Sequence, residues 1–144
     1  MKVCILGNSL SSLALAKALV NKNIYVDLWT SKKTKRPDKS RTIGISKSNV
    51  NFFNNHIINI EKISWKLNKI EIFTDNLKNE KLLNFENSKY ELFSIIKNFH
   101  LFEILEKNLL KSKYFKKISQ NMTKKILDNY NLVINTDYSN LISK

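Results

Sequence analysis

The first thirty residues constrain the fold more strongly than any other part of the chain. Residues 2–6 (KVCIL) form a short apolar run that is typical of a buried parallel strand. Residues 10–22 follow as a helix whose faces are almost all Leu, Ala or Val, and residues 24–29 (IYVDLW) predict a second strand. A strand, a helix and a strand in this order form a βαβ unit, which is nearly always right-handed with parallel strands. We therefore predict an α/β fold with a βαβ nucleus at residues 1–30.

The rest of the chain predicts a mixed α/β order in a single domain, since 144 residues match a typical domain of about 150. The expected elements are a basic loop at 31–40, a short strand at 41–46, a helix at 47–56, a hairpin of strands at 63–73 and 81–86, a strand at 92–96, a helix at about 100–111, a second hairpin at 114–119 and 123–127, and a closing apolar strand at 131–135. The fold class that follows is a Rossmann-like βαβ core with inserted β-hairpins.

The composition places the chain among folding proteins of the cytoplasm. Hydrophobic residues make up 42% of it, which is enough to form a core. Cys4 is the single cysteine and is expected to be a small buried hydrophobe, so there is neither a disulfide framework nor a multi-cysteine metal site. The apolar N-terminus is broken by Gly7, Asn8 and Ser9, which does not fit a signal peptide. No stretch reaches the roughly 18 apolar residues of a membrane span.

The strong positive charge raises the question of a polyanionic partner. There are 25 basic and 12 acidic residues, a net charge of +13, yet Arg36 and Arg41 are the only arginines. The excess of Lys accompanies an excess of Asn and Ile, and A/T-rich codons specify all three. Because Arg is the preferred residue for bidentate contacts to phosphate and guanine, a Lys-only excess does not favour nucleic acid as a partner.

The turn after the first strand carries the most specific chemical pattern. Residues 7–12 (GNSLSS) stand where a dinucleotide-binding fold has G-x-G-x-x-G, between a strand and a helix. Such a turn must be tight, must approach a pyrophosphate closely and must present the free N–H groups of a helix N-terminus. Gly7 meets the first requirement, while Ser9 and Ser12 replace the second and third glycines. Their hydroxyls, with that of Ser11, either donate to a phosphate or cap the helix.

The end of the second strand lacks the acidic residue that commonly binds ribose hydroxyls. Thr30 stands at that end. Asp27, the nearest carboxylate, lies inside the strand and is expected to face away. The sequence therefore predicts a weaker ribose contact, made by Thr30.

Three ordered segments resemble a known enzyme family. The segment ILGNSLSSLALAKALVNKNIYVDLW is similar to the first FAD-binding segment of the flavoprotein aromatic hydroxylases. SRTIGISKSNVNFF resembles the arginine-containing segment of the ubiquinone-biosynthesis hydroxylase group. NLVINTDYSNLISK looks like the family's third signature, an apolar strand followed by A-D-G-x-x-S and a basic residue. Together they span nearly the whole chain.

The resemblance implies FAD as cofactor, a nicotinamide nucleotide, NAD(P)H, as reductant and a small aromatic substrate. It implies that the following residues bind the cofactor: Gly7, Ser9, Leu10, Ser11, Ser12, Thr30, Arg41 and Asp137. Because the cofactor carries the chemistry, neither a catalytic side chain nor a metal ligand is implied. The chain departs from the family pattern at six positions. Ser9, Ser12 and Tyr138 stand where the family has Gly, Phe99 and Lys144 stand where it has Arg, and Thr30 stands where it has an acid.

Members of the family continue beyond the third signature into segments that complete the flavin site and the substrate pocket. The resemblance therefore implies that residues 1–144 are the N-terminal portion of an FAD-binding domain, from a truncated, split or decayed gene, and inactive in hydroxylation alone. We expect a missing C-terminal half or a homo-oligomer as partner. An incomplete domain leaves apolar sheet surface exposed, so we also expect self-association or poor solubility.

Two other functions remain open from sequence. One is a stand-alone nucleotide-binding module. The other is a basic interaction protein in which stretches 32–39 and 111–125 meet RNA or acidic surfaces, since Tyr114 and Phe115 stand among lysines there. Among the remaining chemically notable residues we expect ordinary roles: His56 and His100 on helix faces, and Trp29 and Trp65 in core or rim packing.

Overall fold

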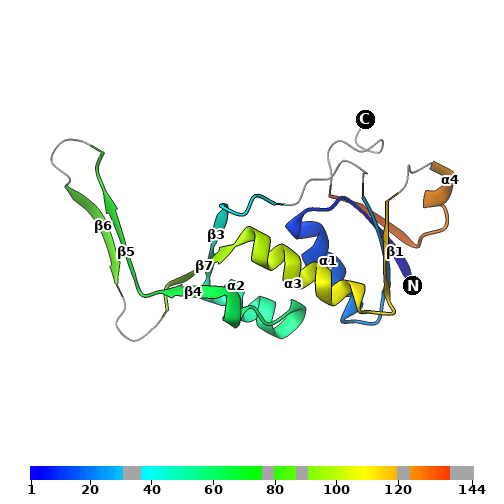
Figure 1. Ribbon diagram of the computed structural model, residues 1–144, viewed down its shortest axis with the longest axis horizontal. Coiled ribbons are helices and arrows are strands. Elements are labelled where there is room, and N and C mark those ends of the chain that lie inside the picture. The colour runs from blue at the N-terminus through cyan, green and yellow to red at the C-terminus, as the bar shows by residue number, and fades with distance from the viewer. Residues whose placement is uncertain (31–36, 76–79, 87–90, 120–123, 137–144) are drawn as a thin grey trace.

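The computed structural model describes residues 1–30, 37–75, 80–86, 91–119 and 124–136. Within these residues the chain forms a parallel sheet, a smaller antiparallel sheet and a two-stranded arm, with two helices between the sheets (Figure 1). The fold class predicted from the sequence, a mixed α/β order on a parallel nucleus, is confirmed.

The parallel sheet is built on the predicted βαβ unit. Its strands are β1 (Lys2–Leu6), β2 (Tyr25–Trp29), β8 (Phe115–Ile118) and β9 (Leu132–Asn135), in the spatial order β8-β2-β1-β9. All three neighbouring pairs are parallel. Helix α1 (Leu10–Val20) connects β1 to β2 and ends two residues earlier than the sequence predicts. The buried residues of β1 and β2 run continuously, as expected for strands covered on both faces.

One face of this sheet packs against α1 and α3 (Asn98–Leu110), which also contact each other. The helix predicted at about 100–111 is confirmed as α3, and its Leu101, Leu105 and Leu109, at intervals of four residues, are fully or almost fully buried. Phe102 is 1% exposed in the same core. Figure 1 shows the two helices side by side between the sheets. This core is therefore shared by the parallel sheet and both long helices.

The opposite face of the parallel sheet has a smaller apolar cluster and a buried polar group. Cys4, Leu6 and Trp29 are buried there and pack against residues of β8, β9 and α4 (Lys124–Leu127). Beside them, the carboxylate of Asp27 lies 2.9 Å from Lys2 Nζ and accepts a 2.6 Å hydrogen bond from the Tyr130 hydroxyl. Cys4 is a buried hydrophobe and Trp29 a core residue, as predicted.

The antiparallel sheet comprises β3 (Thr42–Ser46), β7 (Phe93–Lys97) and β4 (Ser64–Leu67), in the order β3-β7-β4. Between β3 and β4 the chain forms α2 (Lys47–Phe52), a π-helical turn η1 (Phe53–Ile57) and a short 3₁₀ turn η2 (Glu61–Ile63). Val50 and Ile57 are buried, whereas His56 is exposed. The helix predicted at 47–56 is thus divided into α2 and a π turn, and the wider π turn brings Ile57 rather than His56 to the core.

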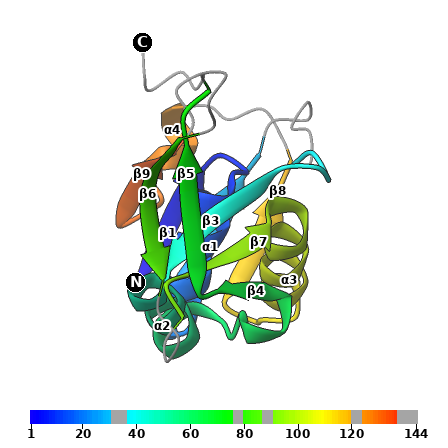
Figure 2. The same ribbon diagram turned by 90° about the vertical axis from the view of Figure 1, so that its left-hand side faces the viewer.

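The arm is the hairpin of β5 (Lys69–Phe73) and β6 (Lys81–Glu86). It projects from the antiparallel sheet at the end of the molecule remote from the parallel sheet (Figure 1), and Figure 2 views the molecule from the arm's side. The predicted hairpin is confirmed, although the strand predicted at 63–73 is divided at Asn68 into β4 and β5, which belong to different sheets.

Two other sequence predictions are wrong. The second hairpin does not form: residues 115–118 pair in parallel with β2, and residues 124–127 are helical. The short sequence FKKI of β8 does not reveal its partner strand, because the parallel register pairs Phe115 with Val26, 89 residues earlier. Trp65 is not a core residue, since it is 75% exposed on β4.

None of the helices in the described segments has the length and apolar character of a membrane span.

Candidate functional site

The carboxyl ends of the four parallel strands meet at one edge of the sheet. Gly7, Thr30, Ser119 and Thr136 directly follow β1, β2, β8 and β9 there. From β1 the chain proceeds to β2 and β8 on one side and then returns to β9 on the other. The gap between the ends of β1 and β9 is therefore a topological switch point, where open α/β sheets bind their ligands.

Gly7 makes the tight turn at this point. It is buried, its φ is 128°, and its N–H donates to the Trp29 carbonyl at 2.9 Å. A side chain in that backbone conformation is strained, so the turn requires glycine here. This is the role expected of the first glycine of a dinucleotide-binding turn.

Ser9 is the N-cap of α1. Its φ of −86° and ψ of 171° are extended values that any residue adopts, so the replacement of the second glycine strains nothing. The Ser9 hydroxyl accepts from the Ser12 N–H at 3.2 Å, and the Ser9 N–H donates to the Ser12 hydroxyl at 3.0 Å. Together these bonds form a capping box. Of the two roles predicted for the serine hydroxyls, Ser9 and Ser12 therefore cap the helix.

The hydroxyls near the turn form a chain with a fixed direction. Thr136 donates to the Leu6 carbonyl at 2.6 Å, and because a hydroxyl has one proton, Ser12 donates to Thr136 at 2.7 Å. By the same reasoning Ser9 donates to Ser12 at 2.8 Å. The Ser9 proton therefore points into the protein. Ser12, which is fully buried, links the helix to β1 and β9 at the position where a third glycine allows close packing.

Two backbone N–H groups remain at the start of α1. Leu10 and Ser11 occupy the first two helical positions, where amides have no intrahelical acceptor, and neither has an acceptor among the described residues. The Ser11 side chain is exposed beside them. Preceding them, Asn8 Oδ1 is buried without a hydrogen-bond partner in the described part of the chain. The turn thus presents donors for an anion and one acceptor that a ligand hydroxyl would satisfy.

Thr30 lies at the same edge and is 4% exposed. Its hydroxyl is 3.1 Å from that of Ser119, and its N–H donates to the Ile118 carbonyl at 2.9 Å. Asp27 lies inside β2, as predicted, and is held by Lys2 and Tyr130 rather than placed at the carboxyl end. The end of β2 therefore offers a hydroxyl in place of a carboxylate.

Arg41 and Asp137 complete the predicted set. Arg41 is exposed just before β3; its carbonyl accepts from the Asn98 N–H at 2.9 Å, and no contact in the described segments joins it to the Gly7 turn. Asp137 lies outside the described residues. The structure thus brings together Gly7 and Ser9 to Ser12, with Thr30 at the same sheet edge. Sequence reasoning missed Ser119 and Thr136, whose signal was a polar residue directly after a strand.

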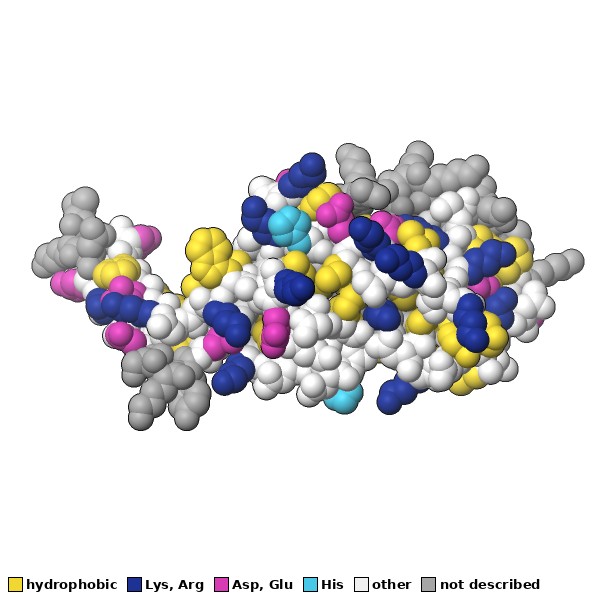
Figure 3. Space-filling model, turned by 60° about the horizontal axis from the view of Figure 1, so that its bottom comes forward, with side chains coloured by type: hydrophobic (Ala, Val, Ile, Leu, Met, Phe, Trp, Pro, Cys, Tyr) yellow, Lys and Arg dark blue, Asp and Glu magenta, His cyan; other side chains and the backbone are white. Residues whose placement is uncertain are grey.

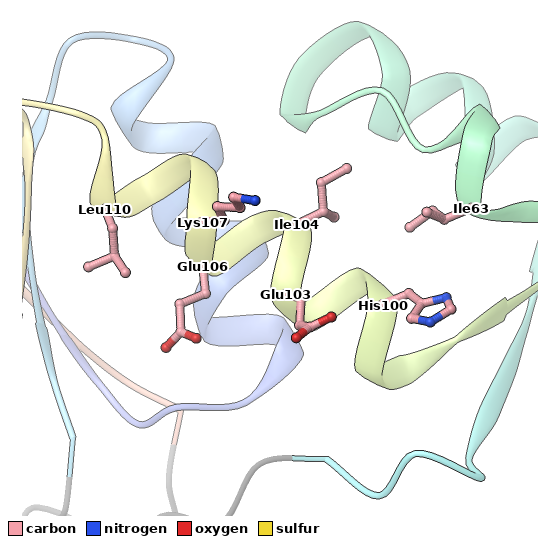
Figure 4. A pocket seen from close by; sticks show the side chains of 7 residues that line it. All are labelled: Ile63, His100, Glu103, Ile104, Glu106, Lys107 and Leu110. Atoms are coloured by element: carbon pink, nitrogen blue, oxygen red, sulfur yellow. The ribbon is translucent and has the colours of Figure 1, made fainter.

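An open recess of about 570 Å³ lies elsewhere, along the exposed face of α3 (Figure 4). Its lining includes His100, Glu103 and Glu106 and contains none of the residues predicted to bind cofactor. Glu106 is already paired with Lys117 at 2.5 Å. His100 is exposed on the helix, as predicted, and the described residues contain no group of three or more potential metal ligands. The recess therefore does not compete with the sheet edge as a candidate site.

Comparison with solved structures establishes the fold. No protein-family model matches the chain, and a search of the curated proteins found no match. The structure of p-nitrophenol 4-monooxygenase PnpA from Pseudomonas putida DLL-E4 matches with a TM-score of 0.65 at 12% identity, covering 81% of this chain and 31% of that one. Klebsiella pneumoniae HpxO, complexed with FAD and uric acid, matches with a TM-score of 0.61 at 15% identity, covering 81% and 30%.

A third match is 2,6-dihydroxypyridine-3-hydroxylase from Arthrobacter nicotinovorans, with a TM-score of 0.58 at 16% identity and coverage of 83% and 30%. Over the matched residues the chain shares the fold of a part of these flavoprotein hydroxylases. At these identities the likeness concerns the fold. The chain spans 30–31% of the length of these three structures.

Proposed function

We propose that this chain is the FAD-binding portion of a flavin-dependent aromatic hydroxylase. The observation that carries the proposal is the Gly7 to Ser12 turn, placed at the switch point of a parallel sheet whose fold is that of such hydroxylases. FAD is favoured among dinucleotides because HpxO, which shares the fold, is complexed with FAD.

The residues at the turn fit a dinucleotide. The amides of Leu10 and Ser11 and the Ser11 hydroxyl would donate to the diphosphate, with the positive end of the α1 dipole behind them. Asn8 Oδ1 would accept from a ligand hydroxyl. Gly7, Ser9 and Ser12 would act by shaping the turn, since the Ser9 and Ser12 protons are used within it. Bound FAD would supply the redox chemistry, for which the chain needs no catalytic side chain.

The ribose contact would be weaker than one made by an acid. Thr30 would take that position, but its hydroxyl already shares a hydrogen bond with Ser119. The net charge of +13 would instead increase the affinity for the cofactor, because a positively charged protein attracts an anionic ligand from a distance. Arg41 and Asp137 remain proposed cofactor contacts by family resemblance. We therefore propose binding that weakens as salt increases.

We also propose the finer assignments that the resemblance implies. These are a small aromatic substrate of the ubiquinone-biosynthesis type, NAD(P)H as reductant, and hydroxylation that requires polypeptide beyond residues 1–144. The last is supported by coverage, because the matched hydroxylases are about three times as long as the region they share with this chain.

The purified chain should be scanned for flavin absorbance and then titrated with FAD, and separately with riboflavin, which lacks the diphosphate. We expect FAD to raise the melting temperature and riboflavin to have a much smaller effect, because the amides of Leu10 and Ser11 would donate to the diphosphate, which riboflavin lacks. At a hundredfold excess over Kd the stabilisation is about 2.7 kcal/mol. Absence of any shift with FAD at low salt would refute the proposal.

A stand-alone nucleotide-binding module is the second candidate. The contacts described at the turn suit the diphosphate of any dinucleotide, and this observation favours it. NADH titrated under the same conditions separates the two candidates. We expect FAD to stabilise the chain more strongly than NADH does, whereas a preference for NADH would favour the second candidate.

A further inference from the structure

The carboxyl end of β2 carries a pair of hydroxyl groups at the position where a carboxylate commonly binds the ribose of a dinucleotide. Thr30 and Ser119 directly follow β2 and β8, and their hydroxyl oxygens are 3.1 Å apart. The pair contains two protons, and the hydrogen bond between the hydroxyls uses one of them, so the other remains for a ligand. Thr30 is buried, whereas Ser119 is exposed. A ligand would therefore reach the pair from the side of Ser119.

The order of the strands places this pair next to the Gly7 turn. β2 lies beside β1 and β8 lies beyond β2, so the sheet edge passes from Gly7 to Thr30 and then to Ser119. Neighbouring strands are about 4.8 Å apart, which puts Ser119 roughly 10 Å from the end of β1. A dinucleotide with its diphosphate at the turn would have its ribose near Thr30. Ser119, one strand farther along, is then placed for a substituent on that ribose.

The acids that the described contacts place on or against these two strands are each paired with a lysine. Asp27 is three residues before Thr30, which is about 10 Å back along β2, and its carboxylate lies 2.9 Å from Lys2 Nζ. Glu106 of α3 is paired with Lys117 of β8 at 2.5 Å. Neither carboxylate is left to bind the ribose. Within the described residues the end of β2 is therefore neutral.

The segments that follow β2 and β8 in the sequence are positively charged. Between β2 and β3 the single acid, Asp38, stands against Lys32, Lys33, Lys35, Arg36, Lys39 and Arg41. Residues 119–125, after β8, contain two lysines and no acid. Asp137 follows β9, which lies on the opposite side of β1. Figure 3 shows Lys and Arg side chains spread over one face of the molecule. Both the local sequence and the net charge of +13 therefore favour an additional negative charge on the ligand.

We propose that the ribose position accepts a 2′-phosphate, so that the site takes nucleotides phosphorylated on the adenosine ribose, such as NADPH. The inference rests on the proposed dinucleotide site and adds its specificity. A carboxylate at the end of β2 selects a ribose with two unmodified hydroxyls, because it accepts their protons and repels a phosphate. Thr30 removes that repulsion, and the Thr30–Ser119 pair has a proton to donate to a phosphate oxygen. Thr30 thus determines specificity, without excluding the unphosphorylated ribose of FAD.

Calorimetric titrations of the unmodified chain with NADPH and with NADH at low salt test the proposal, because the two nucleotides differ only in the 2′-phosphate. We expect NADPH to bind at least as tightly as NADH. Tighter binding of NADH would overturn the inference and keep the dinucleotide site. Binding of FAD by a chain that binds neither nicotinamide nucleotide would overturn the inference as well. Failure of all three to bind would refute the proposed function itself.

Variants of Thr30 separate local repulsion from the general attraction of anions to a basic protein. Thr30→Asp should weaken binding of NADPH relative to NADH at least about tenfold, because it places a carboxylate beside the phosphate. Thr30→Asn has the size of Asp without its charge and should keep the relative affinity of the unmodified chain. Thr74→Asp adds the same charge on the arm, remote from the parallel sheet (Figure 1), and should also keep it.

Thermal melts establish that each variant is folded. An unchanged ratio of NADPH to NADH affinity in folded Thr30→Asp would overturn the proposal, because the phosphate would then bind elsewhere. An equal change in Thr30→Asp and Thr74→Asp would overturn it too, since net charge rather than the ribose position would be responsible. If Thr30→Asp did not fold, the comparison of the two nucleotides on the unmodified chain would still decide.

Discussion

The parallel-sheet body and the β5–β6 arm belong to one chain but differ in how their apolar residues are covered. Phe102 in α3 is 1% exposed, whereas Phe85 on the arm is 50% exposed. The body closes its own core with α1 and α3, and it holds the Gly7 turn. The arm has no core within the described residues. The comparison teaches that the candidate site rests on the part of the molecule whose apolar residues are covered within the described chain.

Truncating one phenylalanine in each region tests this comparison with the largest expected effect. Phe102→Ala should lower the free energy of unfolding by about 3–5 kcal/mol, because it leaves a cavity in a closed core. Phe85→Ala should change it by less than about 0.5 kcal/mol, as for other exposed positions. Urea denaturation of both variants measures the difference. Equal losses would mean that the arm is part of the cooperative core.

The polar cluster on the other sheet face should matter to a lesser degree. Asp27→Ala removes the acceptor of the Tyr130 hydroxyl and the partner of Lys2, so we expect a loss of about 1.5–3 kcal/mol. Asp75→Ala, at an exposed position beside the arm, serves as the control and should be neutral within about 0.5 kcal/mol. Chemical denaturation of both variants measures the two changes in the free energy of unfolding. A neutral Asp27→Ala would show that the cluster adds nothing to the stability of the body.

Two neighbouring serines sharpen the account of the turn. Ser12→Ala breaks the hydroxyl chain from Ser9 to Thr136 and removes one of the two hydrogen bonds of the capping box. We expect it to lower the free energy of unfolding, measured by thermal melts, by about 1 kcal/mol. Ser11→Ala alters an exposed side chain and should leave stability within about 0.5 kcal/mol of the original. If Ser11→Ala proved the more damaging, the hydroxyl chain through Ser12 would not be what stabilises the turn.

The last effect concerns Cys4 and depends on pH. Burial, with the Asp27 carboxylate nearby, raises the pKa of the Cys4 thiol from 9.0 to about 12. The folded state therefore binds more protons than the unfolded state between these values, so its contribution to stability is full below pH 9 and declines as pH rises towards 12. Burial and the hydrogen bond to Asp27 raise the pKa of Tyr130 to about 12, which acts in the same direction.

Urea midpoints at pH about 8 and about 10.5 measure this decline, and Cys4→Ala should reduce but not abolish it. The native thiol should also react with a disulfide reagent only after denaturation, since Cys4 is 0% exposed. Rapid labelling of the native protein would contradict the buried position.

The sequence predicted what local patterns determine. The βαβ unit, the Gly7 turn and the hairpin of β5 and β6 follow from spacing within short segments. The partner of β8 did not, because its pairing with β2 joins residues far apart in sequence. The contribution of Thr136 to the turn is hidden for the same reason, since 124 residues separate it from Ser12. The exposure of Trp65 could not be predicted either, because it depends on where the antiparallel sheet ends.

The central claim is that the Gly7 turn holds a dinucleotide, and the two glycines of the chain test it most directly. Gly7→Ala places a side chain at a φ of 128° in the turn, whereas Gly44→Ala adds a Cβ with nothing within 4 Å of it. FAD titrations of both variants, followed by flavin fluorescence at low salt, should show binding by Gly44→Ala equal to that of the unmodified chain and loss of binding by Gly7→Ala. Equal FAD affinity in both variants would contradict the claim.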